Sequence, residues 1–198
     1  MAWVIVGLGN PGEAYARTRH NTGRLALEYF ARARDFSQWK TDTKSKAAIS
    51  RGTIGKNLVV LVAPDTFMNK SGSAVAQYVK NPKAAERMIV AYDDLDLPLG
   101  TIKLSFDRGS GGHKGLESVM RAVKTKKFAR VRIGVSPQKP SGGVRKPRGE
   151  KAVLEFILQT FDPNEMEILK RVFKKSGDAI EAIVQSGPMR AMNQFNSV

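Results

Sequence analysis

The sequence predicts an α/β protein: a mixed, partly parallel and twisted β-sheet with helices on both faces. Short apolar runs rich in β-branched residues recur along the chain, and stretches with helical periodicity separate them. The 198 residues, 41% of them hydrophobic, suffice for one substantial core. Because no repeat and no linker divides the chain, residues 1–198 are expected to form a single domain.

Apolar runs predict buried strands at 3–6, 58–62, 88–91 and 130–135. Their continuous apolar character is typical of strands that are covered on both faces. Two further segments predict antiparallel neighbours. A turn at 52–56 would join 48–51 to the following strand as a hairpin, and 101–106 alternates in polarity. The sheet is therefore expected to be mixed.

Helical periodicity predicts helices at 25–34, 71–80 and 116–123. The helix predicted between Asp162 and Gly187 has the clearest ends. Asp162 is a suitable N-cap, Pro163 suits the first turn, and Glu165 completes a capping box. Gly187 would end this helix near Ser186, and its apolar stripe is expected to pack in the core.

The formal net charge of +15 is concentrated in one part of the chain. Residues 101–151 contain 14 Lys or Arg and 3 Asp or Glu, a net charge of +11. Within them, the segment 136–149 is rich in Pro, Gly and basic residues and is expected to be a mobile loop. Such a field attracts polyanions through phosphate contacts and counterion release. The charge therefore favours nucleic acid as partner, with a merely solubilising surface as the alternative.

The chain has no cysteine, which excludes disulfides, thiolate metal ligands and a cysteine nucleophile and fits a reducing compartment. No apolar run approaches the roughly 18 residues of a membrane span. A strand that begins near residue 3 leaves no room for a signal peptide. We expect a soluble, cytoplasmic protein with no membrane partner.

The stretch 7–12, GLGNPG, fits the G-x-G-x-x-G pattern of dinucleotide-binding loops. Such a loop requires a helix that opens at the third glycine and an acid at the end of the next strand. Here Pro11 is followed by a long polar stretch, and the next strand ends near Pro64. The glycines are instead expected to form a sharp turn that presents Asn10 at the end of the first strand.

Polar side chains follow all three of the first parallel strands. Asn10 follows the first strand, Asn69 the second, and the acidic stretch 93–96 the third. Ligands of open α/β sheets bind outside the carboxyl ends of the strands, so these groups are expected at one edge. The chain's two histidines, His20 and His113, lie in loops. An imidazole, a carboxylate that fixes its tautomer and amide donors favour hydrolysis, with water as the nucleophile because no G-x-S-x-G motif is present.

Six motifs run in a fixed order over nearly the whole chain: VGLGNPGEAYARTRHNTG (6–23), TFMNKSG (66–72), DDLDLPLG (93–100), GSGGHKGLES (109–118), VRIGV (131–135) and AMNQFN (191–196). In this order and spacing the sequence resembles the bacterial peptidyl-tRNA hydrolase family. The resemblance implies the fold of that family and cleavage of the ester that joins a peptide to tRNA, in a monomer that needs neither a metal nor an organic cofactor.

The resemblance also implies the roles of the site residues. His20 would be the general base for water, Asp93 would hold its ring, and Asn10 would act with them by orienting the carbonyl or the water. The substrate-binding residues would be Tyr15, Phe67, Asn69, His113 and Lys114. The basic field would hold the acceptor stem through its phosphates, independently of sequence. The candidates for phosphate contact are Lys103, Arg108 and Arg132.

The sequence departs from the family pattern at two places. Family members usually have asparagine after the second histidine, where this chain has Lys114. The lysine ammonium donates hydrogen bonds but cannot accept them, and it is expected to lower the pKa of a nearby His20. The family also usually continues the fourth strand with a glycine and a basic residue, where this chain has 135–137, VSP.

Two rival functions remain open at this point. A family member that has lost activity could act as an RNA-binding protein, which Lys114 and the basic loop favour. The intact set of candidate catalytic residues favours the enzyme. A Mg²⁺-dependent nuclease could instead use Asp93, Asp94 and Asp96.

Overall fold

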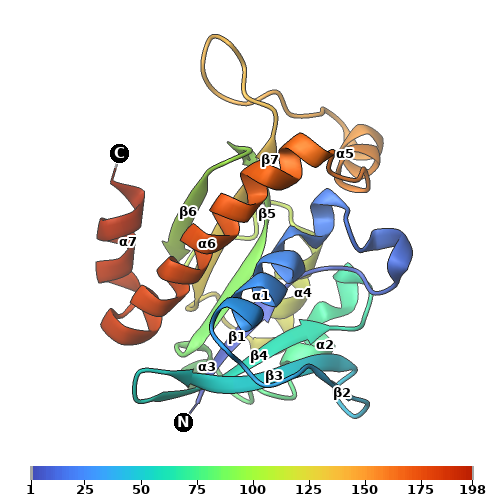
Figure 1. Cartoon of the computed structure of the whole chain (residues 1–198). Helices are drawn as coiled ribbons and strands as arrows, with labels where there is room; N and C mark the ends of the chain where they lie inside the picture. Colours follow the sequence, from blue (N-terminus) through green and yellow to red (C-terminus); the bar gives the residue numbers. More distant parts are fainter. Residues whose placement is uncertain (1, 198) are drawn as a thin grey trace.

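The computed structural model describes residues 2–197 and contains a seven-stranded sheet with the order β2-β3-β4-β1-β5-β7-β6 (Figure 1). The four central strands β4, β1, β5 and β7 are parallel, while β2, β3 and β6 pair antiparallel at the edges. This confirms the predicted mixed sheet. The strands are β1 (Trp3–Gly7), β2 (Lys40–Asp42), β3 (Ala47–Ile54), β4 (Asn57–Pro64), β5 (Met88–Pro98), β6 (Ile102–Phe106) and β7 (Ala129–Ser136).

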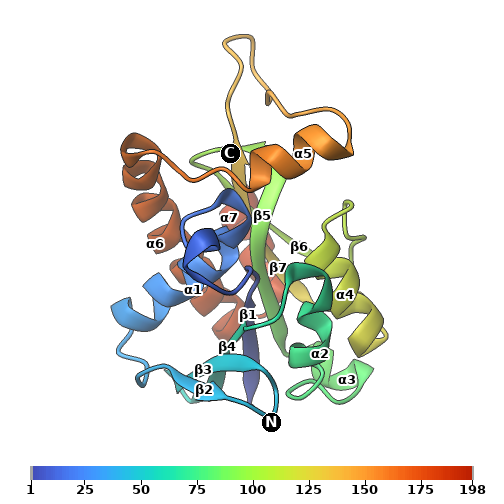
Figure 2. The same ribbon diagram turned by 90° about the vertical axis from the view of Figure 1, so that its right-hand side faces the viewer.

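Helices cover both faces of the sheet, as predicted (Figure 2). One face carries α1, α6 and α7, and the other carries α2, α3 and α4. The α-helices are α1 (Thr22–Ala33), α2 (Ser71–Val75), α3 (Pro82–Ala85), α4 (Lys114–Val123), α5 (Glu150–Ile157), α6 (Pro163–Ser186) and α7 (Pro188–Asn196). Three short 3₁₀ turns are η1 (Glu13–Tyr15), η2 (Arg19–Asn21) and η3 (Met68–Lys70). Within residues 2–197, no helix is long and apolar enough to cross a membrane.

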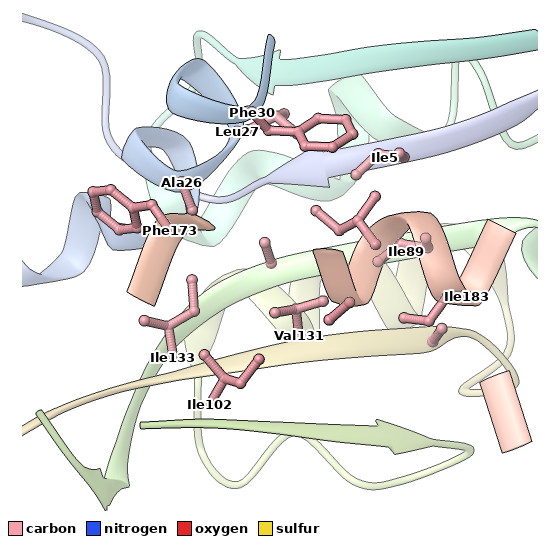
Figure 3. Close-up of a cluster of buried hydrophobic side chains, with 14 of the residues drawn as sticks. Ile5, Ala26, Leu27, Phe30, Ile89, Ile102, Val131, Ile133, Phe173 and Ile183 are labelled. Atoms are coloured by element: carbon pink, nitrogen blue, oxygen red, sulfur yellow. The ribbon is translucent and has the colours of Figure 1, made fainter. Parts of the chain in front are cut away.

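The larger core layer lies between the sheet and the helices α1 and α6 (Figure 3). Leu27 and Phe30 of α1 pack there with Ile5 of β1, each at most 1% exposed. Burying a side chain of this size contributes roughly 1.5–3 kcal/mol, so this layer fixes α1 on the sheet. The second layer packs α2 and α4 against the opposite face and is centred on Val6, Val90 and Leu116.

Helix α6 follows its sequence prediction at both ends. The Asp162 carboxylate accepts from the Glu165 N–H at 2.9 Å, and the Asp162 N–H donates to the Glu165 carboxylate at 3.0 Å. This capping box satisfies two of the N–H groups that a helix start leaves unpaired. Gly187 follows the helix with φ +85°, a conformation that glycine adopts without strain.

Three predicted boundaries were wrong. The β3–β4 hairpin pairs as far as Ile54 and Asn57, so its turn is the two residues 55–56 and not 52–56. The helix predicted over 71–80 ends as α2 at Val75, because the N–H groups of Gln77 and Tyr78 donate to carbonyls only three residues back and so tighten the chain into turns. The third parallel strand was predicted to end at 91, but β5 continues to Pro98.

Candidate active site

Asp93 lies in the part of β5 that extends past the end of its neighbour β1. β1 pairs with β5 only as far as Gly7 and Ala91, whereas β7 continues beside β5 to Asp94 and Gly134. Asp93 therefore stands beyond the end of β1 while it is still held in a strand, and it is only 4% exposed. Asp93 reaches this edge of the sheet because β1 ends early, and not because β5 ends there as the sequence predicted.

A close approach of α1 to β5 brings His20 to the same edge. His20 lies in η2, directly before α1. A Cβ atom on Gly23 would lie 2.2 Å from the Ala91 carbonyl oxygen, and one on Gly7 would lie 2.6 Å from the Gly23 carbonyl oxygen. Only glycine fits at such separations, so these two glycines set the position of His20 relative to Asp93.

His20 Nδ1 lies 3.0 Å from each carboxylate oxygen of Asp93. The neutral imidazole therefore carries its proton on Nδ1 and donates it to Asp93. Nε2 then has a free lone pair, which is the tautomer that a general base requires. Both side chains are buried, at 8% and 4% exposure.

His113 reaches the same carboxylate from the other face of the sheet. Its Nε2 lies 3.0 Å from Asp93 Oδ1. Its Nδ1 accepts from the N–H groups of Gly115 and Leu116 at 3.1 and 3.3 Å, which makes His113 the N-cap of α4. Because Nδ1 is an acceptor, the proton lies on Nε2 and points at Asp93. Asp93 thus accepts from two imidazoles, one before α1 and one before α4.

The sequence analysis missed this contact of His113. It placed His113 among the substrate-binding residues and began the helix at 116. The missed signal was a histidine after a glycine-rich stretch at the start of an apolar helical pattern, which is where an N-cap acceptor belongs.

The charges of this cluster shift the pKa values of its members. Burial acts to raise the pKa of Asp93, but the two adjacent imidazoles outweigh it and hold this pKa well below its usual range. For His20, burial acts to lower the pKa, while the charge and hydrogen bond of Asp93 raise it further than burial lowers it. The expectation that Lys114 lowers the pKa of His20 was wrong, because the neighbouring carboxylate decides the direction.

Asn10 is held by three hydrogen bonds to segments on either side. Its N–H donates to Asn21 Oδ1 at 2.8 Å, and Asn21 Nδ2 donates to its carbonyl at 2.9 Å. Asn10 Oδ1 accepts from the Met68 N–H at 2.8 Å. With its oxygen so engaged, the side chain of Asn10 has its NH₂ group left to offer as a hydrogen-bond donor.

The other residues predicted around the peptide lie on the Asn10 side of the centre. Tyr15 and Phe67 are in edge-to-face contact, with ring centroids 6.5 Å apart, and Phe67 is 57% exposed. Asn69 is exposed in η3, next to the Met68 that binds Asn10. Asn10 also lines a hollow of about 210 Å³.

A larger cavity of about 560 Å³ opens on the Asp93 side of His20. His20, Asp93 and His113 line its floor, and the loop 108–114 forms one wall. Helix α5, which the sequence analysis did not predict, faces this cavity with the apolar side chains of Val153, Leu154 and Ile157. The centre therefore combines polar groups with an apolar cover, as ligand sites commonly do.

The residues predicted to contact phosphate fall into two groups. Lys103 and Arg108 are exposed, and Arg108 lines the large cavity. Arg132 lines it too, but its Nε lies 2.7 Å from Asp94 Oδ2 and its side chain is only 11% exposed. Lys114 is exposed at the first position of α4 and lines the same cavity.

Three potential metal ligands lie close together in this centre. The ligand atoms of His20, Asp93 and His113 lie within 4.8 Å of one another. A metal on His113 Nε2 would move the ring proton to Nδ1, where it would face two N–H donors. Asp94 is paired with Arg132 and Asp96 with Lys146, and within residues 2–197 neither belongs to a cluster of three potential metal ligands. The geometry fits a hydrogen-bonded base and disfavours the nuclease hypothesis.

The fold and these contacts define an α/β protein whose centre is a buried aspartate shared by two histidines at the carboxyl end of a parallel sheet. Comparison with known proteins agrees with the resemblance seen in the sequence. The model of the peptidyl-tRNA hydrolase family matches residues 4–198, and the chain belongs to this family.

Individual relatives cover almost the whole chain. The peptidyl-tRNA hydrolase of Chloroflexus aggregans is 40% identical over 98% of this chain and 98% of its own. That of Aquifex aeolicus is 35% identical over 98% and 95%. The crystal structure of peptidyl-tRNA hydrolase from Acinetobacter baumannii has a TM-score of 0.85 at 32% identity, over 99% of this chain and 95% of that one. The predicted fold is thereby confirmed.

Proposed function

We propose that this protein hydrolyses the ester bond between peptide and tRNA in peptidyl-tRNA, with His20 as the general base. The observation that carries the proposal is the contact of His20 Nδ1 with both oxygens of Asp93, which leaves Nε2 free beside a cavity. Membership of the peptidyl-tRNA hydrolase family supports the same substrate.

In the proposed reaction His20 Nε2 takes a proton from water, and the resulting hydroxide attacks the ester carbonyl. Asp93 stabilises the imidazolium that forms, and the Asn10 NH₂ group donates to a carbonyl oxygen of the substrate. When the tetrahedral intermediate collapses, the imidazolium returns its proton to the leaving ribose oxygen. The products are free tRNA and a peptide carboxylic acid, which releases its proton to the solvent and becomes a carboxylate. The catalytic groups in these steps are side chains of this chain.

Asn10 also offers a reason for selecting peptidyl-tRNA over tRNA that carries a single amino acid. Its oxygen is bound to the Met68 N–H, so only its NH₂ group is available to the substrate. A peptide carbonyl accepts from this group, whereas a charged α-amino group cannot. Sites of this kind discriminate strongly because a mismatched ligand leaves their polar groups unpaired. Tyr15, Phe67, Asn69 and Lys114 complete the proposed contacts with the substrate end, whereas both ring nitrogens of His113 are bonded within the protein.

The tRNA is proposed to bind through its backbone, by the exposed side chains of Lys103 and Arg108. Arg132 is the third candidate, although its pairing with Asp94 leaves less of its guanidinium for a phosphate. The protein is proposed to act as a cytoplasmic monomer. The alternative, a family member that only binds RNA, is disfavoured because His20, Asp93 and Asn10 are all present, with His20 bonded to Asp93 and Asn10 bonded to Asn21, the residue after His20.

Peptide release from purified peptidyl-tRNA tests the proposal. We expect turnover by the wild type, about 10²- to 10⁴-fold slower turnover by His20→Ala, and unchanged rates in EDTA. Lys114→Asn, assayed in parallel, reports how the lysine alters rate and KM. Tight tRNA binding without any turnover would support the RNA-binding alternative, and cleavage of the tRNA itself that stops in EDTA would support the nuclease.

A further inference from the structure

The segment that follows β7 forms a protruding hairpin, which Figures 1 and 2 show extending beyond the body of the protein. Gln138 and Val144 form an isolated antiparallel bridge. Inside it, the Lys139 N–H donates to the Gly143 carbonyl at 3.1 Å, and outside it the Arg145 N–H donates to the carbonyl of Pro137 at 2.8 Å. We call residues 137–145 the arm. With about four residues in each limb, it is about 13 Å long.

The charge of the arm and of its base is entirely positive. Residues 137–149 contain Lys139, Arg145, Lys146 and Arg148 and no acidic residue. All four are exposed. Lys146 is paired with Asp96 at 2.5 Å, whereas the other three side chains make no ion pair or hydrogen bond within the described residues 2–197. Two of these unpaired cations, Lys139 and Arg145, lie on the projecting arm and the third, Arg148, at its base, so they repel one another unless an anion neutralises them.

The base of the arm is attached to the rim of the large cavity. Lys146 and Pro147 line this cavity together with His20 and Asp93. The ion pair between Lys146 and Asp96 joins the base of the arm to β5, three residues after Asp93. A polyanion that ends in the cavity would therefore pass directly beside the arm.

We infer that the arm is a second contact for the tRNA backbone, in which Lys139 and Arg145 bind phosphates outside the catalytic cavity. This inference rests on the proposed function, because that function places the 3′ end of the tRNA in the cavity. The arm contributes to affinity and orientation and takes no part in the chemical step. Its contacts are with phosphates and are independent of base sequence.

The test removes the charge of the arm without shortening it. In the double variant Lys139→Gln/Arg145→Gln, the KM for peptidyl-tRNA is expected to rise roughly fivefold, and the slope of log KM against log salt to fall by about 1 to 2, since each lost phosphate contact removes close to one counterion. kcat is expected to stay unchanged. A minimal substrate, an N-acetylaminoacyl ester of adenosine, is expected to be hydrolysed with unchanged kcat/KM because it has no stem for the arm to bind.

The control variant is Lys174→Gln/Lys175→Gln, which removes two exposed cations from α6. An unchanged KM in the arm variant, or an equal rise in the control variant, would overturn the inference, the latter by showing a mere effect of net charge. If the wild type hydrolysed neither substrate, the proposed function would fail, and direct binding of deacylated tRNA by the same two variants would still decide whether the arm binds RNA.

Discussion

Nε2 of His113 lies 3.0 Å from Oδ1 of Asp93, the same oxygen that lies 3.0 Å from Nδ1 of His20. Because Nδ1 of His113 caps α4, its Nε2 can only be a donor here. The helix start thus fixes the tautomer of His113, and the N–H that His113 donates favours the ionised form of Asp93. The first turn of α4 and the candidate base on the opposite side are coupled through one carboxylate.

The pH dependence of activity follows from the shifted pKa of His20. His20 acts only when neutral, so activity is expected above its pKa and lost as the pH falls through it. Since Asp93 raises this pKa, the acidic limb of log kcat/KM against pH should have its midpoint above the ordinary value of about 6.5. In Asp93→Asn the raising charge is gone while burial remains, so the midpoint should move to lower pH, with a rate about 10³- to 10⁴-fold lower because the tautomer is no longer fixed. A midpoint that rises in Asp93→Asn would contradict this.

Two substitutions of His113 separate its two roles. His113→Ala removes both the cap and the donor to Asp93, and should lower the free energy of unfolding by about 1 kcal/mol. His113→Asn keeps an acceptor for the first turn of α4 but cannot reach Asp93 with an imidazole N–H, so it should restore most of that stability. Its acidic limb should still move to higher pH, because Asp93 then attracts the His20 proton more strongly. Denaturant unfolding and pH profiles of both variants check this, and identical pH profiles in wild type and His113→Asn would be evidence against the coupling.

Asn10→Asp tests the donor assigned to Asn10. The variant retains an oxygen for the Met68 N–H but replaces the NH₂ group with a second oxygen that repels the substrate carbonyl. We expect kcat/KM for peptidyl-tRNA to fall about 10²- to 10³-fold, comparable to the loss of an oxyanion donor, with little change in melting temperature. A fall below about threefold would remove Asn10 from the reaction.

Arg19 connects the segment of His20 to the helices α5 and α6. Its guanidinium lies 4.7 Å from the ring centroid of Phe156 and 4.8 Å from that of Phe161, and it pairs with Glu165 at 2.9 Å. Arg19→Met leaves the half-buried carboxylate of Glu165 without its cation and loses both ring contacts, which should cost about 1–3 kcal/mol of stability. Arg19→Lys keeps the charge but loses the flat guanidinium that stacks on the two rings, so its stability should lie between those of the wild type and Arg19→Met. Calorimetry of the three proteins gives the order, and equal stability of Arg19→Met and the wild type would refute it.

Gly23→Ala tests the close approach that places His20. The new Cβ would lie 2.2 Å from a backbone oxygen of β5, so η2 and α1 must move, and both stability and kcat should fall. Gly109→Ala is the matched control, because a Cβ at that position meets nothing within 4 Å and should change stability by less than about 0.5 kcal/mol. Thermal unfolding compares the stability of the two variants, and the peptide-release rate of Gly23→Ala is compared with that of the wild type.

The sequence was most informative where local rules act. The capping box of Asp162 and Glu165 and the apolar stripe of α6 were predicted from residues close together in the chain, and both were confirmed. The resemblance to the family implied that Asp93 holds the ring of His20, and the two side chains are in contact.

The rest depends on packing between distant segments. The extension of β5 past β1 is set by its pairing with β7, whose Gly134 admits the Pro98 carbonyl at a distance that any side chain would block. The contacts of Arg19 with Phe156, Phe161 and Glu165 join residues more than a hundred positions apart. The direction of the pKa shift of His20 depends on the balance between burial, which lowers the pKa, and the charge and hydrogen bond of Asp93, which raise it, and residue types alone do not give this balance.

The most direct test of the account is the rate of peptide release from purified peptidyl-tRNA by His20→Ala, measured beside its tRNA affinity and melting temperature. The account predicts a rate about 10²- to 10⁴-fold below that of the wild type, with tRNA affinity unchanged and the protein still folded. A folded His20→Ala that releases peptide within about threefold of the wild-type rate would show that another group activates the water.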